Sequence, residues 1–227
     1  MNTKWVKFIC NSNAQIFSES LLKFPITQNE LFGFDVHSFN EEMSHCSYFE
    51  KVTETLSYTL PSGELIKYEV VKIVSFEFKV FFACNESILL CVYEPSKSLK
   101  SFIKNLTDSL RKQIFISNAT MDIIRFYNFV KSSKLFSDFC VSEITVSNLM
   151  FDENNSGELT VKSRMNALAV LEQRFRETGY TCKVMKFTFF HYGNKCQIKI
   201  SKTGSIEFSG DIDDFLPKFI LETLNHR

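Results

Sequence analysis

The spacing of apolar and polar positions predicts different elements along the first fifty residues. Residues 4–10, "KWVKFIC", form a short, mostly apolar run that predicts a strand. Residues 13–24 carry apolar side chains at helical spacing, and Pro25 ends any helix there. Residues 26–50 are polar with scattered aromatic side chains, and their pattern indicates no regular element by itself.

Strand patterns dominate residues 51–93. The segment 51–60 alternates, and the following Pro-Ser-Gly is a turn signal. Residues 64–83 are rich in β-branched and aromatic side chains over a length that exceeds an ordinary strand, so we expect a bend, a bulge or two strands there. After a second turn the run "ILLCVY" returns, and the whole stretch predicts an antiparallel meander.

Two helices are predicted after this meander. Ser96 or Ser98 is the expected N-cap of the first. Its apolar stripe consists of Leu99, Phe102, Ile103, Leu106 and Leu110. The second helix is expected to begin near Asn118 or Thr120, and it is apolar on most sides, which favours burial.

The C-terminal part of the chain predicts the element order β-α-β-β-β-α. The expected elements are a strand at 142–151, a helix at 160–178, strands at 180–190, 195–201 and 205–210, and a final helix that begins at Asp211 or Asp213. The hairpin signal between the last two strands is "KTG".

These patterns predict an α+β fold with antiparallel sheets and with helices packed mainly on one face. We expect an N-terminal half at 1–115, a helical connector at 116–140 and a C-terminal half at 141–227. The strand-turn-strand-helix order at 195–224 also occurs at 78–110. Two pseudo-repeated halves would explain it, and so would any two sheets that each carry a covering helix.

The segment "QIKISKTGSIEFSGDIDDFLPKFI" is similar in layout to the hairpin-then-helix segment of TATA-binding-protein-like domains. With it, residues 142–227 resemble one half of such a domain, which implies a strand, a helix, antiparallel strands and a long covering helix. The phenylalanines that wedge between bases in that family have no residue-by-residue match here. The family's strongly basic character is also absent, so the resemblance does not imply DNA bending.

Composition narrows the class of protein. Hydrophobic residues make up 44% and charged residues 23%, which is typical of a globular chain and excludes a disordered one. The seven cysteines show no CxxC spacing, so we expect reduced thiols. No apolar run approaches the ~18 residues of a membrane span. We therefore expect a cytoplasmic protein without a membrane partner.

The formal net charge is zero, yet the charges are unevenly distributed. Acidic residues outnumber basic ones over 19–69, and basic residues outnumber acidic ones over 158–202. The simpler interpretation is a set of solvated faces, and the other is a basic binding surface. The candidate binding residues for such a surface are Arg164, Arg174, Lys183, Lys186, Lys195 and Lys199.

Glu77-Phe78-Lys79 places an acid and a lysine two residues apart on a predicted strand, with Glu64 upstream. Some Mg²⁺-dependent nucleases hold the metal with carboxylates and steady the attacking water with such a lysine. The usual upstream aspartate is missing, and a solvent-facing Glu/Lys alternation explains the same triplet. The catalytic candidates of this alternative are Glu64, Glu77 and Lys79.

Other signals of chemistry are weak. His45 and Cys46 are adjacent, which is poor chelating geometry, and we expect these and His37 to be loop residues rather than metal ligands. Neither GxGxxG nor GxxxxGK[ST] occurs, so no phosphate-binding loop is visible. We therefore expect no cofactor and no metal.

The chain contains 25 phenylalanines, and the predicted strands near 76–82 and 187–192 are aromatic on both faces. Such strands are covered on both sides, by helices or by a partner. We predict a non-enzymatic binding or assembly subunit of a larger cytoplasmic microbial complex, with a protein partner. A nucleic-acid-handling or phage-defence complex, with nucleic acid as a further partner, is the expectation that the family resemblance adds. The Mg²⁺-dependent nuclease is the alternative, and the oligomeric state stays open.

Overall fold

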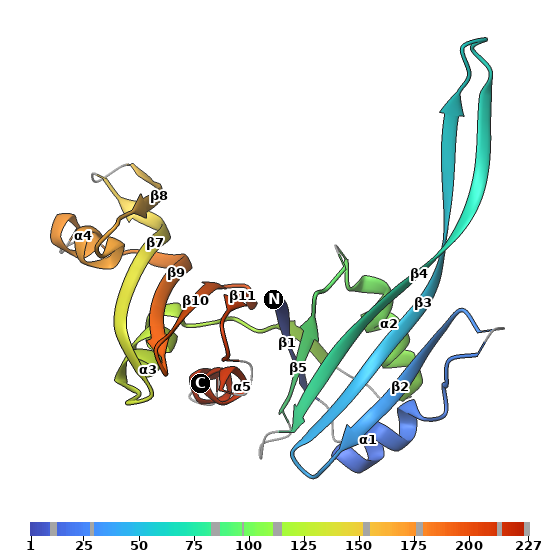
Figure 1. Ribbon diagram of the computed structural model, residues 1–227, viewed down its shortest axis with the longest axis horizontal. Coiled ribbons are helices and arrows are strands. Elements are labelled where there is room, and N and C mark those ends of the chain that lie inside the picture. Colours follow the sequence, from blue (N-terminus) through green and yellow to red (C-terminus); the bar gives the residue numbers. More distant parts are fainter. Residues whose placement is uncertain are drawn as a thin grey trace. The chain divides into compact units, whose positions relative to one another are not determined.

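The computed structural model has an α+β fold built on antiparallel strands, which confirms the predicted fold class (Figure 1). It describes residues 1–9, 13–27, 30–82, 87–96, 98–110, 115–151, 155–175, 179–212 and 215–224. The chain divides into two compact units. The continuous unit is Phe8–Ile116, and the split unit combines Met1–Lys7 with Ser117–Arg227.

The continuous unit is built on an antiparallel meander whose strands pair in the order β2-β3-β4-β5. Its elements are α1 (Ala14–Leu21), β2 (Phe32–Phe39), β3 (Met43–Thr59), β4 (Leu65–Phe82), β5 (Ser87–Tyr93) and α2 (Lys100–Leu110). The predicted meander and the helices on either side of it are confirmed. The strand β2 and the first residues of β3 lie in the segment where the sequence indicated no regular element.

Helices α1 and α2 cover one face of this meander. Tyr48 of β3 and Phe78 of β4 are fully buried there. Their rings meet Phe102 of α2 edge-on, with centroid distances of 5.0 and 5.2 Å. Burying an aromatic side chain of this size contributes about 1.5–3 kcal/mol, so this cluster holds α2 on the sheet. The opposite face, here called the open face, carries the polar side chains of Asp35, Ser47 and Glu77 in its centre, and buried apolar side chains of β5 lie at its β5 side.

Strand β4 is one uninterrupted strand of 18 residues. It pairs with β3 residue by residue from Leu65↔Thr59 to Phe81↔Met43 without a register shift. The expected bend, bulge or division into two strands is therefore wrong. The turn between the strands contains Gly63 at a φ of +85°, so the two long strands form a single hairpin with a tight tip.

The split unit has the strand order β1-β11-β10-β9-β7-β8, and β6 also pairs with β1. Its elements are β1 (Asn2–Ile9), β6 (Phe115–Asn118), α3 (Ile123–Ser132), β7 (Phe136–Met150), β8 (Ser156–Lys162), α4 (Ala167–Arg174), β9 (Thr181–His191), β10 (Asn194–Ser201), β11 (Ser205–Ser209) and α5 (Leu216–Leu224). The last two residues of β1 and the first two of β6 belong to the continuous unit.

Helices α3 and α5 cover one face of the split unit's sheet. Phe187 of β9 contacts Tyr127 of α3 edge-on at a centroid distance of 5.5 Å. Phe136 of β7 contacts Phe219 of α5 at 5.7 Å. The two helices also meet directly, through Phe129 and Phe219 at 5.3 Å. In each unit, therefore, most of the helical packing lies on a single face of the sheet.

The helix expected at 160–178 is wrong in its first turns. Residues through Lys162 form strand β8, whose side chains alternate between exposed and half-buried. The helix α4 begins only at Ala167, where the Asn166 side chain accepts hydrogen bonds from the backbone N–H groups of Leu168 and Ala169. Val161, Met165 and Leu168 are at helical spacing, which favoured the longer helix with these residues in one apolar stripe, yet Met165 is 84% exposed. The capping asparagine decides the boundary here, and the apolar spacing does not.

The joint between β1 and β11 depends on Gly204. Its backbone has a φ of +80° and its carbonyl accepts a hydrogen bond of 2.8 Å from the Trp5 N–H. A Cβ at this position would lie 2.7 Å from the Trp5 carbonyl oxygen and 2.9 Å from that of Ala119. Only glycine fits both the conformation and the space, so the predicted "KTG" turn also serves as the site where β1 joins the sheet.

Candidate functional site

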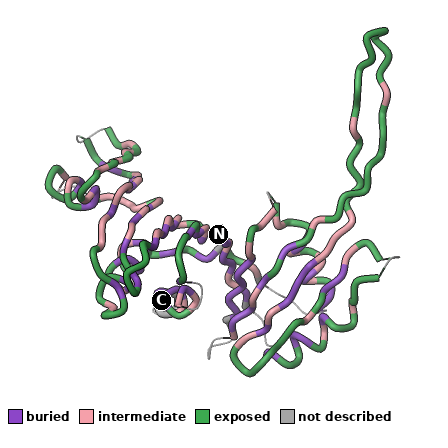
Figure 2. Tube along the Cα trace, viewed as in Figure 1, coloured by how far each residue is buried: buried purple, intermediate pink, exposed green. Residues whose placement is uncertain are grey.

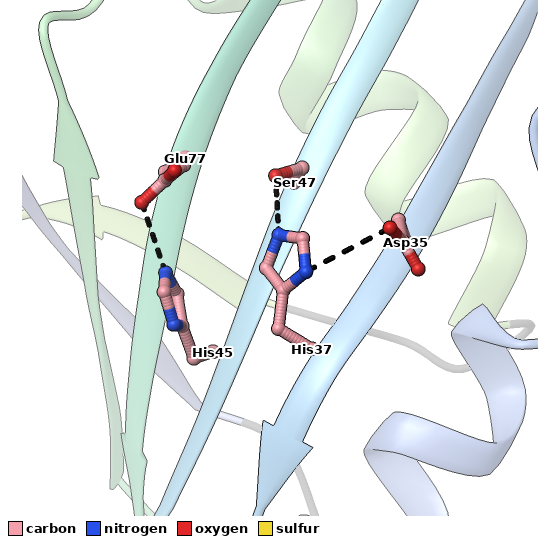
Figure 3. A network of polar contacts seen from close by, with 5 residues as sticks. All are labelled: Asp35, His37, His45, Ser47 and Glu77. Atoms are coloured by element: carbon pink, nitrogen blue, oxygen red, sulfur yellow. Dashed lines mark hydrogen bonds and ion pairs between the residues drawn. The ribbon is translucent and has the colours of Figure 1, made fainter.

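A polar network lies on the open face of the continuous unit's sheet, away from its helices (Figure 3). Three neighbouring strands supply it, because Asp35 of β2, Ser47 of β3 and Glu77 of β4 stand in one row. The His37 Nε2 lies 2.6 Å from the Ser47 Oγ, and its Nδ1 lies 3.7 Å from the Asp35 carboxylate. The His45 Nε2 lies 3.0 Å from the Glu77 carboxylate.

A β-bulge positions His37 in this network. Val36 pairs with Cys46, and Ser38 pairs with His45, so His37 is the extra residue of β2 at this point. Its ring lies 5.0 Å from the ring of His45 in an edge-on contact. The expectation that these two histidines lie in loops is wrong, since both project from strands.

Asp35, His37 and Ser47 follow the order of carboxylate, imidazole and hydroxyl that serine hydrolases use. The contact between Asp35 and His37 is longer than a hydrogen bond. Ser47 sits in the middle of a straight strand that is paired on both sides, to Asp35 and to Glu77, so its backbone N–H serves the sheet and is not free to hold an oxyanion. The geometry therefore favours a structural network over a nucleophile.

The three residues of the nuclease alternative do not come together. Glu77 contacts His45, and the Lys79 ammonium lies 5.2 Å from the centre of the Tyr93 ring. Glu64 sits beside the turn at the far end of β4, where its carbonyl accepts from the Leu60 N–H. Thirteen residues of straight strand separate Glu64 from Glu77, which is roughly 43 Å at ~3.3 Å per residue. They cannot bind one metal ion.

The adjacent His45 and Cys46 point to opposite faces of β3. Cys46 is fully buried on the helix-covered face, and burial raises the pKa of its thiol to about 12, with the Asp35 carboxylate adding to the effect. A thiolate ligand or nucleophile is disfavoured there. Across the part of the chain that the structure describes, no three histidine, cysteine or acidic side chains converge as metal ligands.

The outer part of the β3–β4 hairpin, residues 51–73, forms an arm that extends beyond the rest of its sheet (Figure 1). From Val52 onward β3 pairs only with β4 among the described residues, because the pairing with β2 ends at Glu50 and the Lys51 N–H makes the last backbone hydrogen bond on that side, to the Leu31 carbonyl. Figure 2 shows the arm almost entirely exposed on both faces. Its exposed large apolar side chains are Val52, Tyr58, Leu60, Leu65, Tyr68, Val70, Val71 and Ile73.

The arm begins beside a shallow apolar pocket on the open face. Ile26, Leu31, Phe49 and Ile73 contribute to its lining. The pocket depends on Gly33, because a Cβ there would lie 2.8 Å from the Cα of Ile26. The chain before β2 can therefore cross the sheet face closely. The exposed side chain of Ile73 makes this pocket continuous with the apolar surface of the arm.

The predicted basic residues lie in the split unit, and acidic neighbours offset several of them. On the open face of the sheet, Lys199 lies directly opposite Lys186. Lys199 also lies 3.5 Å from Glu207, and Lys186 stands opposite Glu143 in the register. Across the strands this row therefore reads Glu143, Lys186, Lys199 and Glu207, with an acidic residue at each end.

The other four basic candidates are dispersed. Lys183 forms an ion pair with Glu158. Lys195 is exposed near the start of β10, and Arg164 is exposed in the turn before α4. Arg174 is exposed at the end of α4. Only Lys186 and Lys199 are brought together by the register, so the six residues do not form one continuous basic patch.

No protein-family model matches the chain, and no curated protein matches it. The resemblance to half of a TATA-binding-protein-like domain stays a prediction. Among the described residues, no helix is long and apolar enough to span a bilayer. Function must therefore be argued from this chain's own surfaces.

Sequence reasoning missed the arm as a candidate binding element. The signal was present in residues 64–74, where apolar side chains fall on both strand faces. The expectation of cover by helices or a partner was applied only to the strands near 76–82 and 187–192. Among the described residues, helices lie only over the inner part of the hairpin, so the outer part keeps the pattern of a covered strand without a described cover.

Proposed function

We propose that this protein is a non-enzymatic assembly subunit that binds another protein chain through the arm. The observation that carries the proposal is the exposure of the arm's apolar side chains, with Leu65, Val71 and Ile73 each more than half exposed. A two-stranded hairpin is marginally stable in water by itself. Large exposed apolar patches on folded proteins commonly mark binding surfaces. A partner that buries these side chains would supply the missing stability.

The charges of the arm favour a protein over a nucleic acid. The arm carries three basic and three acidic residues, which are Lys51, Lys67, Lys72, Glu54, Glu64 and Glu69. Lys72 and Glu54 form an ion pair within the arm. A polyanion is bound by an excess of basic side chains, and this surface has none. Apolar contacts and main-chain pairing are the interactions that the arm offers.

The test is a variant in which residues 53–71 are replaced by Asn-Gly. The Lys51 N–H bonds the Leu31 carbonyl on the β2 side, so the neighbouring pair Val52 and Lys72 is the one whose backbone groups face each other, as a two-residue turn requires. The native chain should associate, with itself or with another protein recovered from its source, and the trimmed chain should not. Both should unfold cooperatively at similar denaturant concentrations, as measured by circular dichroism. Equal association of the two chains would overturn the proposal.

Nucleic-acid binding by the split unit is a separate prediction. If Lys186 and Lys199 met phosphates, affinity would fall steeply with salt, because each phosphate contact releases counterions. The Glu143 and Glu207 carboxylates beside these lysines weaken that attraction. We therefore expect no mobility shift with duplex DNA or RNA at low salt. A shift that disappears on reversing Lys195 and Lys199 to glutamate would restore the nucleic-acid interpretation.

A further inference from the structure

The outer edge of β4 is the longest exposed strand edge of the continuous unit. On one side β4 pairs with β3 along its whole length. On the other side it pairs with β5 only at Phe78–Phe82. Among the described residues, no strand pairs with this second edge between Leu65 and Glu77. Its backbone N–H and C=O groups can therefore accept another strand, which is how many proteins bind extended segments.

The sequence of this edge is self-complementary. Residues 64–72 read "ELIKYEVVK", and Tyr68 lies at their centre. Counting outward from Tyr68, each lysine on one side matches a glutamate on the other, as Lys67 with Glu69 and Lys72 with Glu64. The apolar residues match in the same way, because Leu65 corresponds to Val71 and Ile66 to Val70. An antiparallel strand with the same sequence would thus meet opposite charges and apolar side chains in register.

Two-fold symmetry makes this register physically allowed. In an antiparallel pair of strands, directly opposite residues point to the same face. When the two strands are identical, this requires both residue numbers to be even or both to be odd, so that their sum is even. Pairing about Tyr68 gives a sum of 136 and meets this condition. Lys67 would face Glu69 of the other copy on one face of the ribbon, and Ile66 would face Val70 on the other. The two-fold generates each contact twice.

Lys67 and Glu69 of this edge are available for such pairing, whereas Lys72 already forms an ion pair with Glu54 in the arm. Within the arm, Lys67 lies opposite Ser57, and Glu69 lies opposite Thr55. Neither neighbour on β3 carries a charge. Opposite charges placed directly across an antiparallel pair contribute about 0.2–1 kcal/mol each, and like charges destabilise by comparable amounts. The complementary partner for both residues is supplied by the second copy.

The outer edge of β3 lacks these properties. Its residues that share a face with Lys67 are Thr53, Thr55, Ser57 and Thr59, all of them polar. Its charges, Lys51 and Glu54, are three positions apart, so no two-fold register places one against the other. Pairing β3 of one copy with β4 of another would also leave edges open and would build a filament instead of a closed dimer.

We propose that two copies of this chain associate by antiparallel pairing of their β4 edges about Tyr68, which joins two arms into one four-stranded ribbon. This inference rests on the proposed function and names the partner of the arm as a second copy. The apolar side chains of β4, with Leu65 55%, Val71 61% and Tyr68 53% exposed, would be packed against their counterparts. In this closed dimer the β4 edge of each copy is paired with that of the other, so neither β4 edge is left to bind a third copy.

The first test is sedimentation equilibrium on the full-length purified chain. The mass should rise with concentration from 26.4 kDa toward twice that value. Lys67→Glu should raise the dissociation constant roughly ten- to thirtyfold, because it turns two attractive pairs into two repulsive ones. The charge swap K67E/E69K should restore association, since opposite charges again face one another. Lys134→Glu, an exposed lysine in the split unit, is the control for net charge.

The second test reads the register. Tyr68→Cys places two thiols directly opposite each other on the two-fold, where copper-phenanthroline and oxygen should oxidise them to an intermolecular disulfide. Tyr58→Cys is the matched control, because Tyr58 is equally exposed and contacts Tyr68 at a ring distance of 6.0 Å. Three strand spacings, about 14 Å, and a shift of about 13 Å along the strands would separate its copies, because Tyr58 pairs with Ile66 and not with Tyr68, and this is too far for a disulfide. Native cysteines are common to both variants.

The outcomes separate this inference from the proposed function. A chain that stays monomeric at all concentrations, or a K67E/E69K variant no better than K67E, overturns pairing about Tyr68. Equal cross-linking of the two cysteine variants overturns it too. If a different protein then binds the native chain and not the trimmed one, the proposed function still stands. If nothing distinguishes the native from the trimmed chain, both proposals fail.

Discussion

The inner and outer parts of the β3–β4 hairpin share the same two strands and the same register, yet their surroundings are opposite. The inner part, residues 43–50 and 74–82, lies under α1 and α2 and contains the fully buried Tyr48 and Phe78. The arm continues the pairing without interruption, and within the described part of the chain no helix covers either of its faces (Figure 2). The pairing of β3 with β4 is therefore the same in the two parts, whereas burial and the further pairing with β2 and β5 belong to the inner part.

This contrast separates what forms a strand from what stabilises it. β-branched and aromatic residues favour the extended conformation along the whole of β4. Stability comes mainly from apolar burial, which only the inner part obtains within this chain. The arm should behave as a formed but weakly protected ribbon unless a partner covers it.

The largest expected difference is in amide hydrogen exchange. Amides of the inner strands should exchange only through global unfolding, which costs about 5–15 kcal/mol in a typical domain. Amides of the arm should exchange through local opening at a small fraction of that free energy, when the chain is dilute and monomeric. Mass spectrometry of peptides from the two parts measures this. Equal protection of both parts in a monomer would show that the arm is as stable as the inner part, against this prediction.

Truncating one aromatic side chain in each part should give the next largest difference. Phe78→Ala removes a fully buried ring that contacts Phe102 and Phe34, and it should lower the free energy of unfolding by about 3–5 kcal/mol. Tyr68→Ala in the arm should change it by less than about 0.5 kcal/mol in dilute solution. Urea denaturation of both variants gives the values. A loss above about 2 kcal/mol for Tyr68→Ala would show that the arm is part of the cooperative core.

Removing one buried hydroxyl should have a smaller effect. The Asn105 side chain donates a hydrogen bond of 2.7 Å to the Tyr48 hydroxyl, so Tyr48→Phe should cost about 1 kcal/mol at neutral pH. Burial raises the pKa of Tyr48 to about 12, and this contributes stability below pH 10 that is lost as the pH rises toward 12. The native chain should therefore lose more stability than Tyr48→Phe over that interval. Denaturation series at pH 9 and pH 11.5 would show it, and parallel losses would contradict the assignment.

The smallest effect is expected at the arm's ion pair. Lys72 and Glu54 are both about half exposed, and solvent screens such pairs strongly. Glu54→Gln should change the free energy of unfolding by less than about 0.5 kcal/mol, at low or high salt. Thermal melts at two salt concentrations are sufficient. A larger, salt-sensitive loss would mean that charge, and not burial, holds the arm together.

Local patterns predicted much of this fold because they report local preferences. The alternation in "KCQIKIS" and the glycine of "KTG" are enough to predict the hairpin of β10 and β11. The boundaries of α4 and β8 were missed because Val161 and Met165 fit a helical stripe. The Asn166 side chain instead caps a helix that begins only at Ala167. The spacing of apolar residues is compatible here with a helix and with a strand, and contacts with the rest of the chain select between the two.

The open-face network and the arm could be predicted only in part. Glu77 and Lys79 were recognised as a polar pair on a strand, but the pairing of β3 with β2 and β4 brings Asp35, Ser47 and Glu77 into one row. That row depends on registers between distant segments. The arm is left uncovered because α2 begins beside Glu50, where the Ser101 hydroxyl donates to the Glu50 carboxylate, and residues 51–73 do not encode that position themselves.

The position of β1 has a consequence for synthesis on the ribosome. The continuous unit is encoded by one uninterrupted stretch, so its strands and helices can pack once residue 116 has left the exit tunnel. Asn2, Thr3 and Lys4 pair with Glu207, Ile206 and Ser205, near the other end of the sequence. This opening strand must wait for more than two hundred residues to be translated, and at ~5–20 residues per second that takes at least ten seconds. We expect nascent chains arrested near residue 150 to protect the continuous unit from protease while their first residues are still cleaved.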